Sequence, residues 1–139
     1  MAYSQSFKNV PYLGFPDGSY RWIGILYQTG TDDPIVYENF VDDFSAVNKG
    51  NDIVTFVRED TGLFYMSLAN NSYFSDQSKI IVRLTPNITN LYSYEQPPII
   101  VSYLIIDGYT LALYNWSLKD EIPENNLWNY LYLEVIKLP

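Results

Sequence analysis

The chain has 139 residues, which is the size of one domain. Of these residues 47% are hydrophobic and only 17% are charged, a composition that excludes a disordered chain and predicts a well-formed core. Sixteen acidic residues against eight basic ones give a net charge of −8. Such a surface repels phosphate backbones and anionic lipid, so we expect neither nucleic acid nor a membrane as a partner. Cysteine and histidine are absent, which excludes disulfides, thiolate zinc sites and catalysis that depends on either residue.

The N-terminal stretch is predicted to form an irregular arm. It is rich in proline and glycine, shows no period of two, and lacks both the basic and the apolar segments of a signal peptide. We predict that residues 1–19 attach the protein to a partner surface and that residues 20–139 form a single β-domain. The expected aromatic anchors of the arm are Tyr3, Phe7, Tyr12 and Phe15.

From residue 20 onward, short runs of aliphatic and aromatic residues alternate with turn clusters. Many short strands at this spacing indicate an all-β protein, either an antiparallel β-sandwich or a jelly-roll-like domain. One segment, Ile122–Asn129, is the helical candidate. The predicted strands are Trp22–Thr29, Ile35–Tyr37, Asp43–Val47, Ile53–Arg58, Leu63–Leu68, Ile80–Thr85, Ile99–Ile106, Tyr109–Trp116 and Tyr130–Leu138.

Two turns predict hairpins. Asp107-Gly108 lies between two β-prone runs and favours a tight hairpin with a type I′ turn, which needs positive φ twice. Glu59-Asp60-Thr61-Gly62 predicts a second hairpin with a longer loop.

The last two long strands carry bulky residues on both faces. A lone sandwich needs only one apolar face per sheet, so two such faces imply a second burial surface. We therefore expect a homo-oligomer. One face carries Leu111, Leu113, Leu131, Leu133 and Val135, and the other carries Tyr114, Trp116, Tyr130 and Tyr132.

The sequence offers little catalytic chemistry. Paired carboxylates at turns are Asp32-Asp33, Asp42-Asp43, Glu59-Asp60 and Asp120-Glu121. A glycosidase needs two carboxylates across a cleft, but acids at turns are more commonly solvated. Calcium binding by the first two pairs is chemically sensible, although their spacing matches no known loop. We expect no enzymatic activity, no cofactor and no metal site.

Aromatic side chains supply the candidate ligand-binding residues. The three tryptophans could stack on sugar rings, but packing in the core or at a subunit interface is the favoured interpretation for each. Tyr92 and Tyr94 lie in a predicted loop that runs to Pro97-Pro98, where side chains are less often needed for packing in the core. Together with Trp116 they are the predicted ligand-binding residues.

Four segments carry a resemblance to a known family: WIGILYQTGTDDPIVYEN, VREDTGLFYMSL, SKIIVRLTP and LYLEVIKLP. In this order they resemble a β-domain found at the ends of bacteriophage fibre and appendage proteins. The closing strand departs from the family pattern at Ile136, Lys137 and Leu138. The matching residues are Gln28, Thr29, Gly30, Thr31, Pro34, Glu38, Asn39, Gly62, Phe64, Leu68, Leu133, Glu134, Val135 and Pro139.

The resemblance implies a virion appendage, usually trimeric, that is made in the host cytoplasm. It implies docking on other virion proteins and contact with a glycan or protein of the host surface. The first hypothesis is therefore a structural and binding protein of a phage particle, such as a head or tail fibre or an adaptor. The alternatives are a stand-alone carbohydrate-binding or lectin-like module and, from the enzyme class, a glycan hydrolase.

Overall fold

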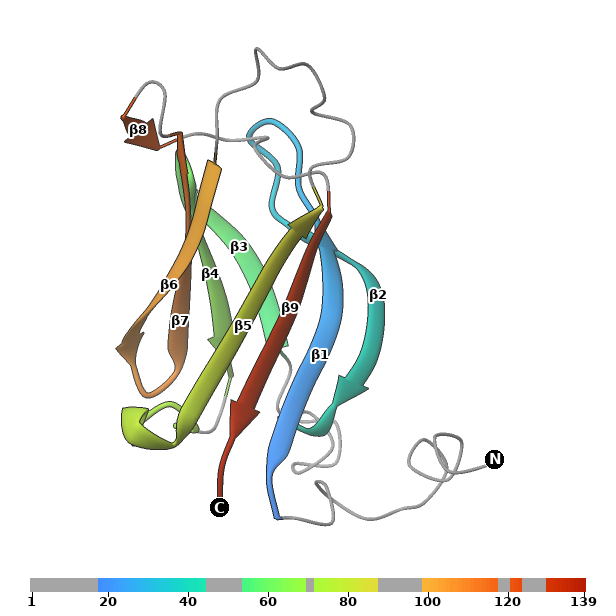
Figure 1. Cartoon of the computed structure of the whole chain (residues 1–139), viewed down its shortest axis with the longest axis vertical. Helices are drawn as coiled ribbons and strands as arrows, with labels where there is room; N and C mark the ends of the chain where they lie inside the picture. Colours follow the sequence, from blue (N-terminus) through green and yellow to red (C-terminus); the bar gives the residue numbers. More distant parts are fainter. Residues whose placement is uncertain (1–17, 45–53, 70–71, 88–98, 118–120, 124–129) are drawn as a thin grey trace.

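The computed structural model describes residues 18–44, 54–69, 72–87, 99–117, 121–123 and 130–139 of the chain. Two antiparallel sheets pack face to face as a β-sandwich, which confirms the predicted all-β fold (Figure 1). The described residues include no helix that is long and apolar enough to cross a membrane. The strands are β1 (Tyr20–Tyr27), β2 (Ile35–Asp42), β3 (Val54–Asp60), β4 (Leu63–Leu68), β5 (Ile80–Asn87), β6 (Ile99–Asp107), β7 (Thr110–Ser117), β8 (Ile122–Pro123) and β9 (Tyr130–Lys137).

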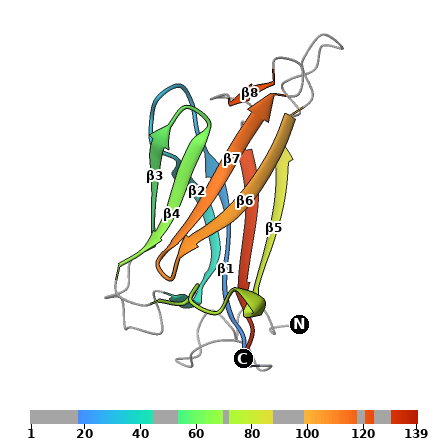
Figure 2. The same ribbon diagram turned by 90° about the vertical axis from the view of Figure 1, so that its left-hand side faces the viewer.

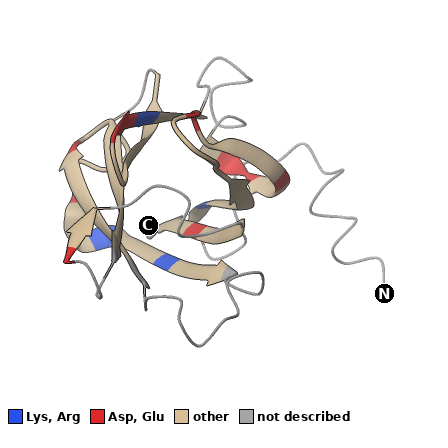
Figure 3. Ribbon diagram, turned by 90° about the horizontal axis from the view of Figure 1, so that it is seen from above, with Lys and Arg blue, Asp and Glu red and all other residues tan. Residues whose placement is uncertain are grey.

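The first sheet has the order β2-β1-β9-β5, and the second has the order β3-β4-β7-β6, with β8 paired to β7. Figure 2 shows β3, β4, β7 and β6 side by side. Viewed from above, the two sheets lie on opposite sides of the core (Figure 3). A short 3-10 helix, η1 (Gln77–Lys79), precedes β5. The first and last long strands, β1 and β9, are neighbours in the middle of the first sheet.

The core lies between the sheets and is filled by alternate residues of the central strands. The predicted alternation is confirmed: Leu131, Leu133 and Val135 of β9 and Leu111 and Leu113 of β7 are fully buried. These inward positions meet buried residues of the other strands because each strand points every second side chain to the same face. The other buried apolar residues include Trp22, Leu26, Phe44, Phe56, Phe64, Met66, Leu68, Phe74 and Ile80.

The turn between β1 and β2 contains several residues on which the family resemblance rests. Gln28 is buried, and its Nε2 donates hydrogen bonds to the carbonyls of Gly30, at 2.8 Å, and Asp32, at 3.2 Å. Gly30 has a φ of 57°, a conformation that glycine adopts without steric cost. The segment QTGTDDP is therefore explained locally as a turn whose backbone is held by one buried amide.

Strand β2 contains two β-bulges. Register shifts leave Tyr37 and Phe40 without an opposite residue on β1. Asn39, between them, donates its Nδ2 to the carbonyls of Ile23, at 3.2 Å, and Val41, at 3.1 Å. A bulge bends its strand and turns a side chain to a new direction, so these two positions change what the outer face of the sheet presents.

Part of the strand predicted at Asp43–Val47 is wrong. Asp43 and Phe44 form a helical turn after β2, and residues 45–53 lie outside the described residues. The reason is tertiary packing, because Phe44 is fully buried and packs against the rings of Tyr73 and Phe74. Their ring centroids lie 5.0 Å and 6.2 Å from that of Phe44.

The helix predicted at Ile122–Asn129 is wrong at its first two residues. Ile122 and Pro123 form β8 and pair with β7, while residues 124–129 lie outside the described residues. Pairing with the neighbouring strand prevails here over the local helix signal of a proline at a first turn.

Both predicted hairpins are present, but their turns differ from the prediction. Gly108 does not have a positive φ, so the type I′ turn is wrong. Asp107 instead accepts a hydrogen bond from the Tyr109 amide through Oδ1 at 2.8 Å, which holds the turn from its side chain. The β3–β4 hairpin turns at Thr61-Gly62, with Gly62 at a φ of 68°, and is shorter than predicted.

Candidate ligand-binding groove

A groove of about 560 Å³ crosses the outer face of the first sheet. We call it the tyrosine groove; it is lined by Ile25, Tyr37, Thr85, Pro86, Tyr130 and Tyr132. Ile25 of β1 and Thr85 of β5 both lie opposite Tyr132 of β9, so three neighbouring strands contribute one continuous row. The groove lies over the part of the sheet where β1 and β5 end and β9 begins.

Tyr130 is the central ring of the groove. The Tyr37 ring of β2 meets it edge-on with centroids 4.9 Å apart, and the Tyr27 ring of the neighbouring strand β1 lies 5.5 Å away. Tyr37 is 60% exposed and stands at one of the β2 bulges. Tilted and edge-on arrangements of this kind are the preferred ones for aromatic pairs and stabilise the orientation of both rings. The rings of Tyr37 and Tyr130 therefore form a prearranged aromatic wall.

The Tyr132 side chain forms one end of the groove. Its hydroxyl donates a hydrogen bond to Oε2 of Glu134 at 3.0 Å. Burial and this hydrogen bond raise the pKa of Tyr132 above its ordinary value of 10.0. The phenol is thus protonated at neutral pH, and its ring is held in position by a buried carboxylate.

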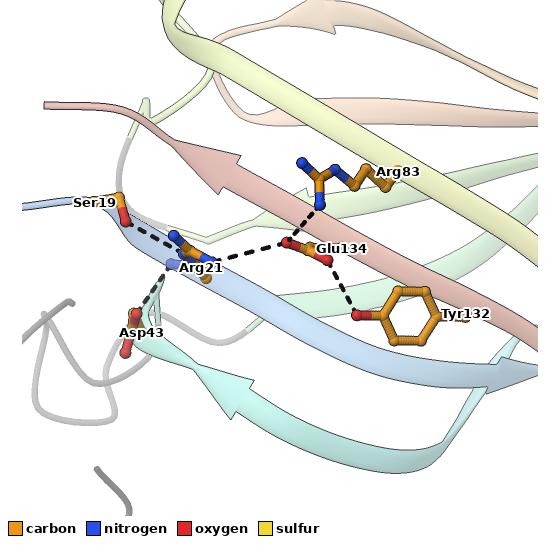
Figure 4. A network of polar contacts seen from close by, with 6 residues as sticks. All are labelled: Ser19, Arg21, Asp43, Arg83, Tyr132 and Glu134. Atoms are coloured by element: carbon orange, nitrogen blue, oxygen red, sulfur yellow. Dashed lines mark hydrogen bonds and ion pairs between the residues drawn. The ribbon is translucent and has the colours of Figure 1, made fainter. Parts of the chain in front are cut away.

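A polar network continues from Glu134 toward the start of β1 (Figure 4). Oε1 of Glu134 lies 3.9 Å from Nη1 of Arg21 and 4.0 Å from Nη1 of Arg83. Nε of Arg21 donates to Ser19 Oγ at 3.3 Å, and its amide donates to Oδ2 of Asp43 at 3.0 Å. Burial raises the pKa of Asp43. The network links β1, β5, β9 and the turn that follows β2, all of them parts of the sheet that carries the groove or adjoining it.

The predicted ligand-binding residues are not brought together at this groove. Trp116 is 39% exposed and lies on β7, in the other sheet. Tyr92 and Tyr94 lie outside the described residues, as do the arm residues Tyr3, Phe7, Tyr12 and Phe15. Trp22 is 2% exposed and packs in the core, which agrees with the favoured interpretation that the tryptophans pack in the core or at a subunit interface.

Ser19, the last residue of the predicted arm, is fully buried. Its hydroxyl accepts the Arg21 hydrogen bond described above, so this position is tied to the sheet. Gly18, just before it, lies beside the C-terminal Pro139. Residues 1–17 lie outside the described residues.

The sequence reasoning missed the groove: it did not single out Tyr27 and Tyr37, and it assigned Tyr130 and Tyr132 to a second burial surface of an oligomer. The sequence indicates only the direction of these side chains, because Tyr130 and Tyr132 alternate with buried leucines, and Ile25 and Tyr27 alternate with Leu26 in the same way. Two tyrosine-bearing faces on strands that pair with each other predict an aromatic surface. That β1 pairs with β9 was not visible in the sequence.

The acidic pairs considered for calcium are too far apart for one site. Asp32-Asp33 precedes β2. Asp42 is the last residue of β2 and Asp43 follows it, so about 25 Å of extended strand separates the two pairs. Asp33 accepts a hydrogen bond from the Arg58 amide at 2.8 Å, and Asp43 accepts one from the Arg21 amide. No group of three or more potential metal ligands occurs among the described residues.

The tyrosine groove offers aromatic faces, aliphatic contacts and hydroxyl groups. This combination suits a ligand that has both an apolar face and hydrogen-bonding groups. Comparison of the chain with protein-family models, curated proteins and solved structures finds no match.

Proposed function

We propose that this protein is a structural and binding component of a bacteriophage particle, and that the tyrosine groove binds a sugar ring of a host-surface glycan. One observation carries the ligand proposal: the exposed Tyr37 ring lies edge-on to the Tyr130 ring, and both rings line the tyrosine groove. The virion part of the proposal is supported by the family resemblance of the ordered sequence segments alone.

The groove chemistry favours a carbohydrate. A pyranose has one face of C–H groups that packs on an aromatic ring, and hydroxyls around its rim that exchange hydrogen bonds. Tyr37 and Tyr130 supply the rings, while Thr85 and Tyr132 supply hydroxyls beside them. A mainly apolar groove with a few placed polar groups is the usual form of a small-ligand site.

We expect Tyr37→Ala to weaken glycan binding about tenfold, because it removes one exposed wall of the groove and leaves the core unchanged. A glycan array identifies a bound sugar, and titration calorimetry then compares the two proteins. Tyr109→Ala is the matched control, since Tyr109 is 46% exposed but lies at the β6–β7 turn of the other sheet. Absence of binding to any glycan, or equal affinities for Tyr37→Ala and the unaltered protein, would contradict the proposal.

A stand-alone carbohydrate-binding module is the second candidate, because the same groove would serve it. The two candidates differ in whether the protein is built into a particle. Gold-labelled antibodies against the protein, applied to purified particles in the electron microscope, separate them: labelling supports the virion component, and unlabelled particles support the free module.

A deletion within the predicted arm tests whether the arm attaches the protein to the particle. Deleting residues 2–17 is expected to leave the thermal midpoint within about 3 °C, because the deletion spares the buried Ser19 and its bond to Arg21. Incorporation into particles is expected to be lost. Calorimetry measures the first and immunoblotting of purified particles the second. A truncated chain that no longer folds would show that the arm belongs to the core, and a folded one that still enters particles would refute its attachment role.

A further inference from the structure

The tyrosine groove has charged neighbours beyond the end that Tyr132 forms. Arg83 lies on β5 two residues before Thr85, so both side chains point to the same, outer face of the first sheet. Glu134 of β9 lies opposite Arg83. The row of the sheet next to the groove therefore contains one carboxylate and one guanidinium.

In this row the carboxylate is buried and the cation is exposed. The Glu134 side chain is 10% exposed, whereas the Arg83 side chain is 66% exposed. Oε2 of Glu134 accepts the hydrogen bond of the Tyr132 hydroxyl, and Oε1 faces both arginines of the network (Figure 4). A ligand that extends beyond the Tyr132 end of the groove therefore meets a guanidinium and not a carboxylate.

The two arginines that share Oε1 of Glu134 are held differently. Arg21 is 26% exposed, and its Nε donates to Ser19 Oγ at 3.3 Å. Nη1 of Arg83 lies 4.0 Å from Oε1, and an exposed ion pair at this distance contributes little to stability. Arg83 can therefore turn toward a ligand at small cost. Glu134 would keep Arg21 and Tyr132 as partners, so no uncompensated carboxylate would be left buried.

The opposite side of the groove carries the opposite charge. Glu38 of β2 is exposed and lies opposite the groove residue Ile25. Strands β2 and β5 are the two edges of the first sheet, three strand spacings or roughly 14 Å apart. A charged ligand in the groove would therefore be oriented, with an anionic group toward Arg83 and away from Glu38.

The inference that follows rests on the proposed function, in which the groove binds a sugar ring. We propose that this sugar is acidic and that Arg83 binds its anionic group. A guanidinium presents a planar fork of donors that matches two oxygens of one anionic group. A ring stacked on Tyr37 and Tyr130 can direct an acidic group at its rim along the sheet toward Arg83. The net charge of −8 acts against such a ligand mainly at long range, where salt screens exposed charges more than about 8 Å apart.

A glycan array tests the preference for charge. It carries oligosaccharides with a carboxylate, a sulfate ester or a phosphate ester, each beside a neutral counterpart that lacks the acidic group. The unaltered protein is expected to bind one acidic class about tenfold more tightly than its neutral counterpart, and titration calorimetry of that pair measures the ratio. The class that is bound identifies the anionic group.

Arg83→Gln is expected to weaken binding of the acidic glycan about tenfold and to leave binding of its neutral counterpart within about twofold, because only the charge is removed. Arg83→Lys keeps the charge without the planar fork, so its affinity for the acidic glycan should lie between the two. Arg58→Gln is the matched control, since it removes an equal charge from β3 of the other sheet. The thermal midpoint of Arg83→Gln should stay within about 2 °C, because Glu134 keeps Arg21 as a partner. If Arg83→Gln does not fold, the lower affinity of Arg83→Lys for the acidic glycan alone decides.

The outcomes separate this inference from the proposed function. Equal affinities for acidic and neutral glycans, or an acidic affinity that Arg83→Gln leaves unchanged, would overturn the role of Arg83. If Tyr37→Ala still weakens binding in that case, the tyrosine groove remains a sugar site. Absence of binding to any glycan, or binding that Tyr37→Ala leaves unchanged, would overturn both proposals.

Discussion

Leu133→Asp is expected to leave the protein largely unfolded at 25 °C. Leu133 is fully buried in β9, with Gly24 of β1 and Leu84 of β5 opposite it on the two sides. Removing a buried leucine side chain alone costs about 2–5 kcal/mol, and an aspartate adds the cost of an unpaired buried carboxylate. The total is comparable with the roughly 5–15 kcal/mol by which a domain of this kind is stable.

Urea unfolding monitored by tryptophan fluorescence measures this loss. Leu133→Ala should give an intermediate value of about 2–5 kcal/mol, which separates the lost packing from the buried charge. Ile35→Asp is the control, because the same carboxylate at a 57% exposed position should change stability by less than about 0.5 kcal/mol. A Leu133→Asp protein with a native-like midpoint would show that β9 does not face the core.

Gly24→Ala is expected to destabilise the protein by about 3 kcal/mol, the upper part of the range for overpacking. An added Cβ would lie 2.6 Å from Cη2 of Trp22 and 2.7 Å from the carbonyl oxygen of Glu38. The Trp22 ring is held in the core against Phe56, and the Glu38 carbonyl belongs to the paired backbone of β2. Neither neighbour can move away without disturbing packing or strand pairing.

Thermal unfolding should show a fall of roughly 10 °C for Gly24→Ala. In a double-mutant cycle, Trp22→Phe should reduce the cost of the added methyl group, because the smaller ring vacates one of the two contacts. Gly30→Asn is the control: nothing lies within 4 Å of a Cβ there, and asparagine tolerates its positive φ. An unchanged midpoint for Gly24→Ala would refute the close approach of β1 and β2.

The strands that could be predicted from the sequence are those whose residues alternate clearly. In β9 the buried Leu131, Leu133 and Val135 alternate with Tyr130 and Tyr132, and this period of two is set by local geometry. The same reasoning identified β7 and both hairpins. Local pattern was thus sufficient for the fold class and for the direction of the main core residues.

The groove could not be predicted because it depends on which strands become neighbours. Its row joins Ile25, Tyr132 and Thr85 from strands far apart in the sequence, and the pairing of β1 and β5 with β9 is a result of tertiary packing. The exposed position of the Tyr37 ring depends in addition on a β-bulge, and no residue of β2 (IVYENFVD) predicts a bulge. The type I′ turn predicted at Asp107-Gly108 failed for a similar reason. Tertiary packing accounts for the glycine there, because an added Cβ would lie 2.7 Å from Oγ of Ser75 and 2.8 Å from Cβ of Ser72.

The neighbouring positions of β1 and β9 also decide how the protein would bear a mechanical load. Gly18 lies beside Pro139. β1 begins and β9 ends at the same end of the sandwich (Figure 1), while the groove residues Ile25 and Tyr130 lie near the end of β1 and the start of β9. A molecule anchored through its N-terminal side and held by a ligand in the groove is pulled lengthwise along β1. The hydrogen bonds of β1 to β2 and β9 run across that direction and are strained together, in shear, so separation requires breaking many of them at once.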